Sequence, residues 1–109
     1  MYDKELLKGN TETLLLALLN DEPMYGYQIV KEMDRRSSGY FQFREGTLYP
    51  ALHRLEKSGM IRGVWTPSEH GQQRRYYSLT EAGSKFLAAK SREWQTFSAA
   101  VNLVMQPVR

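Results

Sequence analysis

The chain has 109 residues, 41% of them hydrophobic and 25% charged, with no cysteine and a formal net charge of +3. This length and apolar content predict one folded domain with at most one added element. The lack of cysteine excludes a disulfide framework, a thiolate nucleophile and a zinc ribbon, and it fits a cytoplasmic protein. The mild excess of cations makes nucleic acid a reasonable partner.

The sequence gives no sign of a membrane or targeting segment. Residues 1–10 are charged and contain no apolar signal region. The apolar run at residues 14–19 is far shorter than the ~20 residues that a membrane helix needs. We therefore expect no membrane partner.

The first third of the chain predicts helices. Residues 2–8 are compatible with a short helix. Asn10 or Thr11 is then expected to cap a main helix through residues 13–19, which is apolar nearly all round and should lie in the centre of the core. Residues 21–23 end this helix because Pro23 cannot continue it.

A second helix is expected from about Tyr25 or Gly26 to Arg36. Its apolar stripe, with Tyr25, Ile29 and Met33 at intervals of four, predicts one buried face. After this helix, residues 41–44 alternate between aromatic and polar, which is compatible with a very short strand.

Residues 45–59 predict a third helix, on which the rest of the interpretation depends. Leu48, Ala51, Leu52 and Leu55 share one face and should be buried. Thr47 is a plausible cap, which would place Pro50 in the first turn, and Gly59 is suited to end the helix. Proline is tolerated in a first turn, and glycine is common just after a helix.

The opposite face of this helix carries Pro50, His53 and Lys57, flanked by Tyr49 and Arg54. A helix with one buried stripe and one cationic, hydrogen-bonding face suits insertion into a DNA major groove. The alternative is an ordinary amphipathic helix whose outer face is only solvated. Cations outnumber acids from residue 44 to residue 75, where Arg44, Arg54, Lys57, Arg62, Arg74 and Arg75 stand against Glu45, Glu56 and Glu69.

A β-hairpin is expected after Gly59. Residues 60–66 and 74–79 have strand-like composition, and the polar residues 67–73 between them include proline and glycine. Three helices followed by a hairpin predict a winged helix-turn-helix DNA-binding domain over residues 1–79, with the hairpin as the wing. Arg74 and Arg75 favour contact with phosphate or the minor groove over a merely solvated edge, and one of Tyr76 and Tyr77 should point inward.

Thr80 is expected to cap a last helix, from Glu81 to about Gln106, in which Gly83 is a weak spot. Its apolar positions recur at intervals of seven, three, four and three, which is a heptad pattern: Leu87, Trp94, Phe97, Val101 and Val104. We therefore predict that residues 80–109 form a C-terminal dimerisation helix and that the partner is an identical copy. The expected fold class is mainly α with a small β-hairpin, as a winged helix-turn-helix plus a C-terminal dimerisation helix.

Three linked motifs resemble the PadR family of bacterial transcription regulators: YGYQI at residues 25–29, GTLYPALHRLE at 46–56 and RRYYSLTEAG at 74–83. The resemblance covers roughly residues 11–83, and the single helix after the wing is similar to the short branch with multidrug-sensing members. It implies a homodimeric, DNA-binding repressor that responds to drugs or phenolic compounds. In that branch a tryptophan on the last helix lines a pore between subunits, and Trp94 has a similar place here.

These expectations assign roles to individual residues. Contacts to phosphate and sugar are expected from Thr47, Tyr49, Lys57, Arg74 and Arg75. Contacts to base edges or a thymine methyl are expected from Pro50, His53 and Arg54. A two-fold dimer would place two such helices about 34 Å apart, so the target should be an inverted repeat in double-stranded DNA.

A ligand site at the dimer interface is expected around Trp94, with Phe97 and Val101 as an apolar wall. A flat aromatic compound stacked there would gain about 1 kcal/mol beyond area burial. The alternative is that Trp94 is simply part of the packed interface.

Other classes of function find less support. No nucleophile has a base at a recognisable spacing and no Gly-rich phosphate loop is present, so we expect no enzyme and no cofactor. His53 and Glu56 alone do not make a metal site. Two further hypotheses are a winged-helix module for protein assembly and a small-molecule-binding protein without a DNA role.

Overall fold

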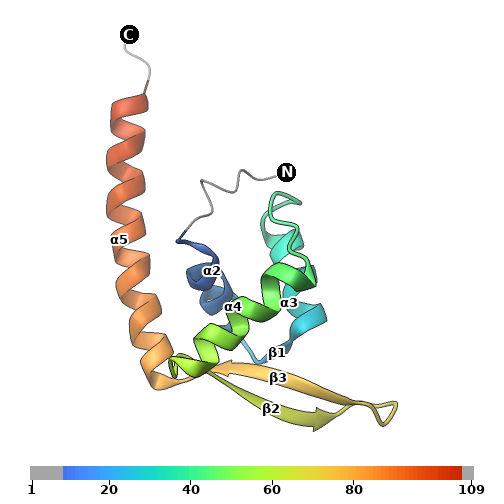
Figure 1. The fold of residues 1–109 in the computed structure, drawn as a ribbon. Coiled ribbons are helices and arrows are strands. Elements are labelled where there is room, and N and C mark those ends of the chain that lie inside the picture. Colours follow the sequence, from blue (N-terminus) through green and yellow to red (C-terminus); the bar gives the residue numbers. More distant parts are fainter. Residues whose placement is uncertain (1–8, 107–109) are drawn as a thin grey trace.

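The computed structural model describes residues 9–106, which form four helices and a small three-stranded antiparallel sheet (Figure 1). The expected fold class, mainly α with a small hairpin, is confirmed. The short helix expected at residues 2–8 lies outside the described residues. In chain order the elements are α2 (Thr11–Leu19), β1 (Met24–Tyr25), α3 (Gly26–Arg36), α4 (Glu45–Lys57), β2 (Ile61–Pro67), β3 (Gln73–Leu79) and α5 (Glu81–Met105). Helices α2, α3 and α4 lie on one side of the sheet (Figure 1).

The sheet has the order β1-β3-β2. Gly63 of β2 lies opposite Tyr77 of β3, and Trp65 lies opposite Arg75. The third strand, β1, is only two residues long and pairs Tyr25 with Tyr76. The short strand that alternation suggested at residues 41–44 is wrong, because Phe43 is buried and Phe41 packs against the core from an irregular loop.

The core lies where α2, α3, α4 and the sheet meet. Leu15 and Leu16 of α2 are fully buried, which confirms the central place expected for this helix. The predicted stripe of α4 is also buried, and its four members join one cluster with residues of every other element. The buried apolar residues are Leu15, Leu16, Leu18, Leu19, Met24, Ile29, Met33, Phe43, Leu48, Ala51, Leu52, Leu55, Ile61, Tyr77 and Leu87.

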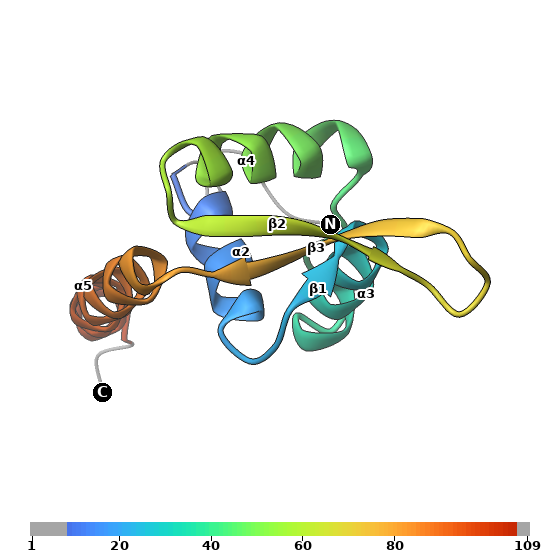
Figure 2. The same ribbon diagram turned by 90° about the horizontal axis from the view of Figure 1, so that it is seen from below.

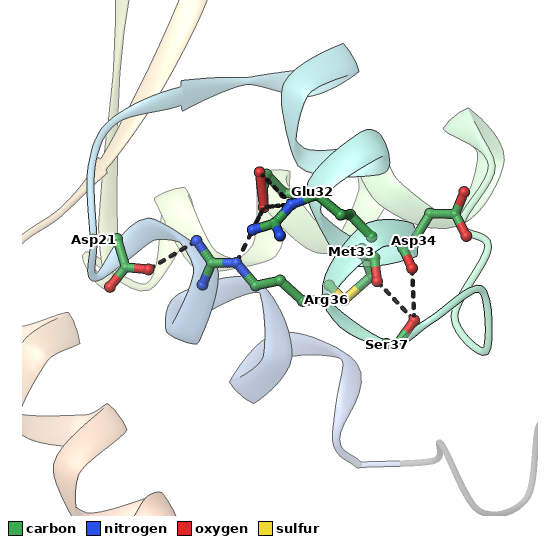
Figure 3. Close-up of polar contacts among 7 residues, drawn as sticks. Asp21, Glu32, Met33, Asp34, Arg36 and Ser37 are labelled. Carbon is green, nitrogen blue, oxygen red and sulfur yellow. Dashed lines mark hydrogen bonds and ion pairs between the residues drawn. The ribbon is translucent and has the colours of Figure 1, made fainter.

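Polar contacts stabilise the last turn of α3 (Figure 3). The Arg36 guanidinium lies 2.7 Å from a carboxylate oxygen of Asp21, in the loop after α2, and 3.1 Å from Glu32 on its own helix. The Ser37 hydroxyl donates to the carbonyl of Met33 at 2.7 Å. These contacts close the helix and connect its last turn to the α2–β1 loop.

The expected cap of α4 is wrong by three residues, because the N-cap is Arg44 rather than Thr47. The helix begins at Glu45, and the carbonyl of Arg44 accepts hydrogen bonds from the N–H groups of Thr47 and Leu48 at 3.0 and 2.9 Å. Thr47 is therefore inside the helix rather than its cap. Pro50 lies in the second turn, where it removes the N–H that would bond to the Gly46 carbonyl. The helix starts early because buried Phe43 anchors the chain immediately before it.

The end of α4 is as expected. Gly59 has a φ of +80°, which glycine adopts without a steric penalty. Its N–H donates to the carbonyl of Glu56 at 3.1 Å, and the N–H of Met60 donates to the carbonyl of Leu55 at 2.9 Å. This pair of bonds is the Schellman arrangement that satisfies the last carbonyls of a helix.

Helix α5 begins at the predicted cap. The Thr80 hydroxyl accepts a hydrogen bond from the N–H of Gly83 at 3.0 Å and donates to the carbonyl of Gly59 at 2.6 Å. Gly83 is buried, and a Cβ there would overlap the carbonyl oxygen of Met60. The glycine that was expected to weaken α5 therefore allows the helix to pack against the α4–β2 turn. Beyond its first turns, α5 extends away from the other elements (Figure 1).

Candidate nucleic-acid interface

The outer face of α4 is open to solvent. The residues on the face expected to meet DNA are all exposed to solvent: Thr47, Tyr49, Pro50, His53 and Lys57. Tyr49 is 45% exposed, and its hydroxyl end lies directly over Gly26, where a Cβ would collide with it. The absence of a side chain at Gly26 therefore lets α4 approach the start of α3 closely.

Arg54 lies at the edge of this face toward α2. Its Nε is 3.3 Å from a carboxylate oxygen of Glu12, and both side chains are largely exposed. Exposed pairs of this kind contribute about 0–1 kcal/mol, so Arg54 can exchange this partner for another anion at little cost. Its predicted contact with base edges stays a prediction.

The wing lies beside α4, and its turn projects beyond α3 (Figure 2). Arg74 and Arg75 are neighbours on β3, and successive strand residues point to opposite faces of a sheet. The Arg74 guanidinium lies 4.4 Å from the centre of the Tyr25 ring. Arg75 instead forms an ion pair with Glu56 of α4. The two arginines expected to share one role thus have different partners.

An open groove of about 660 Å³ runs between α4 and β3. Its lining combines hydrogen-bonding aromatic residues with cations and one acid: Tyr49, His53, Glu56, Lys57, Arg75 and Tyr77. Tyr77 is the inward member of the tyrosine pair at 7% exposure. Burial raises the pKa of its hydroxyl, while the charge of Arg75 acts in the opposite direction. This groove suits an anionic backbone bound beside α4.

Sequence reasoning missed two parts of this site. It counted Glu56 among the acids of this region and weighed it with His53 as part of a metal site, but did not connect it with Arg75. It also missed β1, which brings Tyr25 beside β3, with the Tyr25 and Tyr76 ring centres 5.3 Å apart. The available signal for the position of Arg75 was Gly63, because a glycine inside a strand often marks the close approach of another group.

The residues at the predicted heptad positions of α5 fall into two groups. Leu87 is buried in the core of its own chain, so little of it remains for a second subunit. Farther along the helix, Trp94 and Phe97 are 55% and 62% exposed, and their ring centres lie 6.0 Å apart. Val101 is half-buried and Val104 is exposed. Met105, which was not predicted, adds to this exposed apolar surface, whereas Leu103 is also exposed but lies on another side of α5.

Other kinds of site are not found in the described part of the chain. Within residues 9–106, no three His, Asp or Glu side chains are grouped so that they could hold a metal ion. Among the same residues, no helix is long and apolar enough to cross a membrane.

Comparisons with known proteins agree with this architecture. The model of the "Transcriptional regulator PadR-like family" matches residues 15–89. Transcriptional regulator Rv3488 of Mycobacterium tuberculosis is 31% identical over 98 residues, which are 90% of this chain and 88% of that protein.

Solved structures give the same result. A transcriptional regulator from Clostridium thermocellum has a TM-score of 0.86 and 30% identity, over 97% of this chain and 100% of that one. A PadR-like transcriptional regulator from Bacillus cereus has a TM-score of 0.84 and 30% identity, over 95% of this chain and 99% of that one. The chain belongs to the PadR-like family, and it is a transcriptional regulator rather than an enzyme.

Proposed function

We propose that two copies of this chain pair through α5 and bind an inverted-repeat operator in double-stranded DNA as a repressor. A small aromatic ligand at the dimer interface relieves the repression. The observation that carries the DNA-binding part is the exposed outer face of α4, with His53 and Lys57 on it and the groove to the wing beside it. Helices that present such a face are typical of major-groove readers.

The dimer is supported by the apolar surface of α5. Large contiguous apolar surfaces on a folded domain usually mark an interface. Among residues 9–106, α5 exposes four large hydrophobic side chains that share one side of the helix at helical spacing: Trp94, Phe97, Val104 and Met105. A second α5 related by a two-fold axis would cover this surface, so we keep residues 80–109 as the dimerisation unit.

DNA binding can be tested with Lys57→Ala. Loss of one phosphate contact should weaken binding to all sequences alike and reduce the salt slope, log K against log[salt], by about 0.9. The measurement is the affinity for DNA upstream of the chain's own gene at two salt concentrations. Lys85→Ala on α5 removes the same charge away from α4 and should change neither quantity.

The outcome of the same titration also separates the alternatives. A steep salt dependence together with preference for the upstream DNA over a scrambled duplex supports the proposal. Equal affinity for both duplexes removes sequence-specific regulation and favours the protein-assembly module.

The ligand part of the proposal depends on Trp94. Its ring and that of Phe97 already form an aromatic pair on the exposed side of α5. A planar aromatic ligand stacked on Trp94 gains about 1 kcal/mol, so Trp94→Ala should weaken its binding at least about five-fold. Calorimetry with a panel of planar aromatic cations and acids checks this. Trp65→Ala, which removes the wing tryptophan, is the matched control and should bind the ligand normally.

If Trp94→Ala binds the ligand as tightly as the parent, Trp94 does not belong to a ligand site. Ligand binding can control DNA binding only if it favours one spacing of the recognition helices over another. A ligand that separates the two α5 helices would change this spacing. Structures with and without ligand that show the same spacing contradict this coupling.

A further inference from the structure

One ion pair connects α4, the helix proposed to enter the major groove, to the wing. A guanidinium nitrogen of Arg75, on β3, donates to a carboxylate oxygen of Glu56, in the last turn of α4. Each side chain is only 30% exposed. The pair therefore spans two elements that both border the groove expected to receive DNA, and it lies partly within the protein.

The sheet is shaped to hold the Arg75 side chain in this position. A Cβ at Gly63, on the neighbouring strand, would lie 2.5 to 2.9 Å from three guanidinium atoms of Arg75, so only glycine leaves room for it. The Trp65 and Tyr77 ring centres lie 5.6 and 5.9 Å from the guanidinium carbon. An arginine between two rings and above a glycine loses little further freedom when it meets Glu56.

An acidic residue such as Glu56 is not expected on a surface whose only role is to attract phosphate. Its negative charge lies in the same groove as His53, Lys57 and Arg75, where it repels DNA and neutralises the nearest cation. We propose that Glu56 and Arg75 are positioning residues, whose ion pair fixes the orientation of the wing relative to α4. Arg75 is then not a phosphate contact.

The orientation itself does not depend on any partner of the protein, whereas its effect on DNA depends on the DNA binding proposed above. The substitution Glu56→Gln distinguishes two explanations, because electrostatics alone and loss of positioning predict opposite changes in DNA affinity. Glu56→Gln removes a negative charge near DNA, so electrostatics alone predicts tighter binding. Loss of a fixed wing predicts weaker binding, by about five-fold, although the protein becomes more positive. Glu69→Gln in the wing turn removes the same charge without touching Arg75 and should bind DNA as well as the parent or slightly better.

A double-mutant cycle tests whether the two residues act together. We expect Arg75→Gln to weaken DNA binding, and the double variant with Glu56→Gln to be no weaker than Arg75→Gln alone. If Arg75 instead contacts phosphate by itself, Glu56→Gln tightens binding and the two effects add. That result overturns the proposal.

Hydrogen exchange without DNA makes the test independent of the proposed function. Glu56→Gln should speed amide exchange in β2 and β3 at least about three-fold, while α2 and α3 keep the parent's rates and show that the fold is intact. Unchanged exchange in the wing overturns the proposal, whatever happens with DNA. A parent protein that fails to bind DNA but shows the exchange effect contradicts the proposed function and leaves the positioning role supported.

Discussion

Replacing Phe97 with Asp is expected to prevent the proposed dimer from forming at micromolar concentration and to weaken binding to the proposed operator about a hundred-fold. The Phe97 ring is 62% exposed and lies beside Trp94 on the outer face of α5. A carboxylate in the centre of a two-fold apolar interface would face its own copy, with no partner to offset the loss of hydration. Losing the second recognition helix removes the gain from bivalent binding, which is typically 10²–10⁴-fold.

Light scattering and DNA titration measure the two effects of Phe97→Asp separately. Gln95→Asp is the matched control, because it adds the same charge two residues away on another side of α5. It should remain dimeric and bind the operator normally. A dimer that survives Phe97→Asp contradicts the assignment of this surface to self-association.

Replacing Gly83 with Ala should destabilise the protein by about 3 kcal/mol, near the upper end of the usual cost of overpacking. The added methyl group would overlap the Met60 carbonyl oxygen, which is backbone and also accepts a hydrogen bond from the N–H of Thr80 at 3.1 Å. Relief requires α5 to move away from the α4–β2 turn. For a chain of this size the melting temperature should fall by roughly 15 °C.

Gly46→Ala is the control for this experiment. Gly46 also lies in a helix, but nothing is within 4 Å of a Cβ placed there. An alanine should therefore stabilise α4 by about 0.5–1 kcal/mol, since it lowers the entropy of the unfolded chain. If thermal unfolding shows Gly83→Ala to be as harmless as Gly46→Ala, the close approach of α5 to Met60 is not important for stability.

Periodicity was sufficient to predict most of the fold. Leu48, Ala51, Leu52 and Leu55 repeat at helical spacing, and their burial fixes which side of α4 faces outward. The hairpin was readable because two strand-like segments flank a polar turn. The cap of α4 was not, because it depends on where Phe43 enters the core, and the alternation of residues 41–44 suggested a strand where the structure has an irregular loop.

The candidate site was predictable in its residue types but not in its pairings. The exposure of His53 and Lys57 follows from the helical stripe, whereas the Glu56–Arg75 pair depends on how β3 lies against α4. Gly83 was misjudged for a related reason. Its low helix propensity is visible in the sequence, but the carbonyl that requires a glycine comes from Met60, more than twenty residues away.

A hydroxyl-radical footprint on the DNA upstream of the chain's own gene tests the central claim most directly. If two α4 helices enter consecutive major grooves, the protein protects two related half-sites whose centres lie about 10 base pairs apart, in inverted orientation. A single protected patch, or uniform protection without a preferred sequence, would contradict the account.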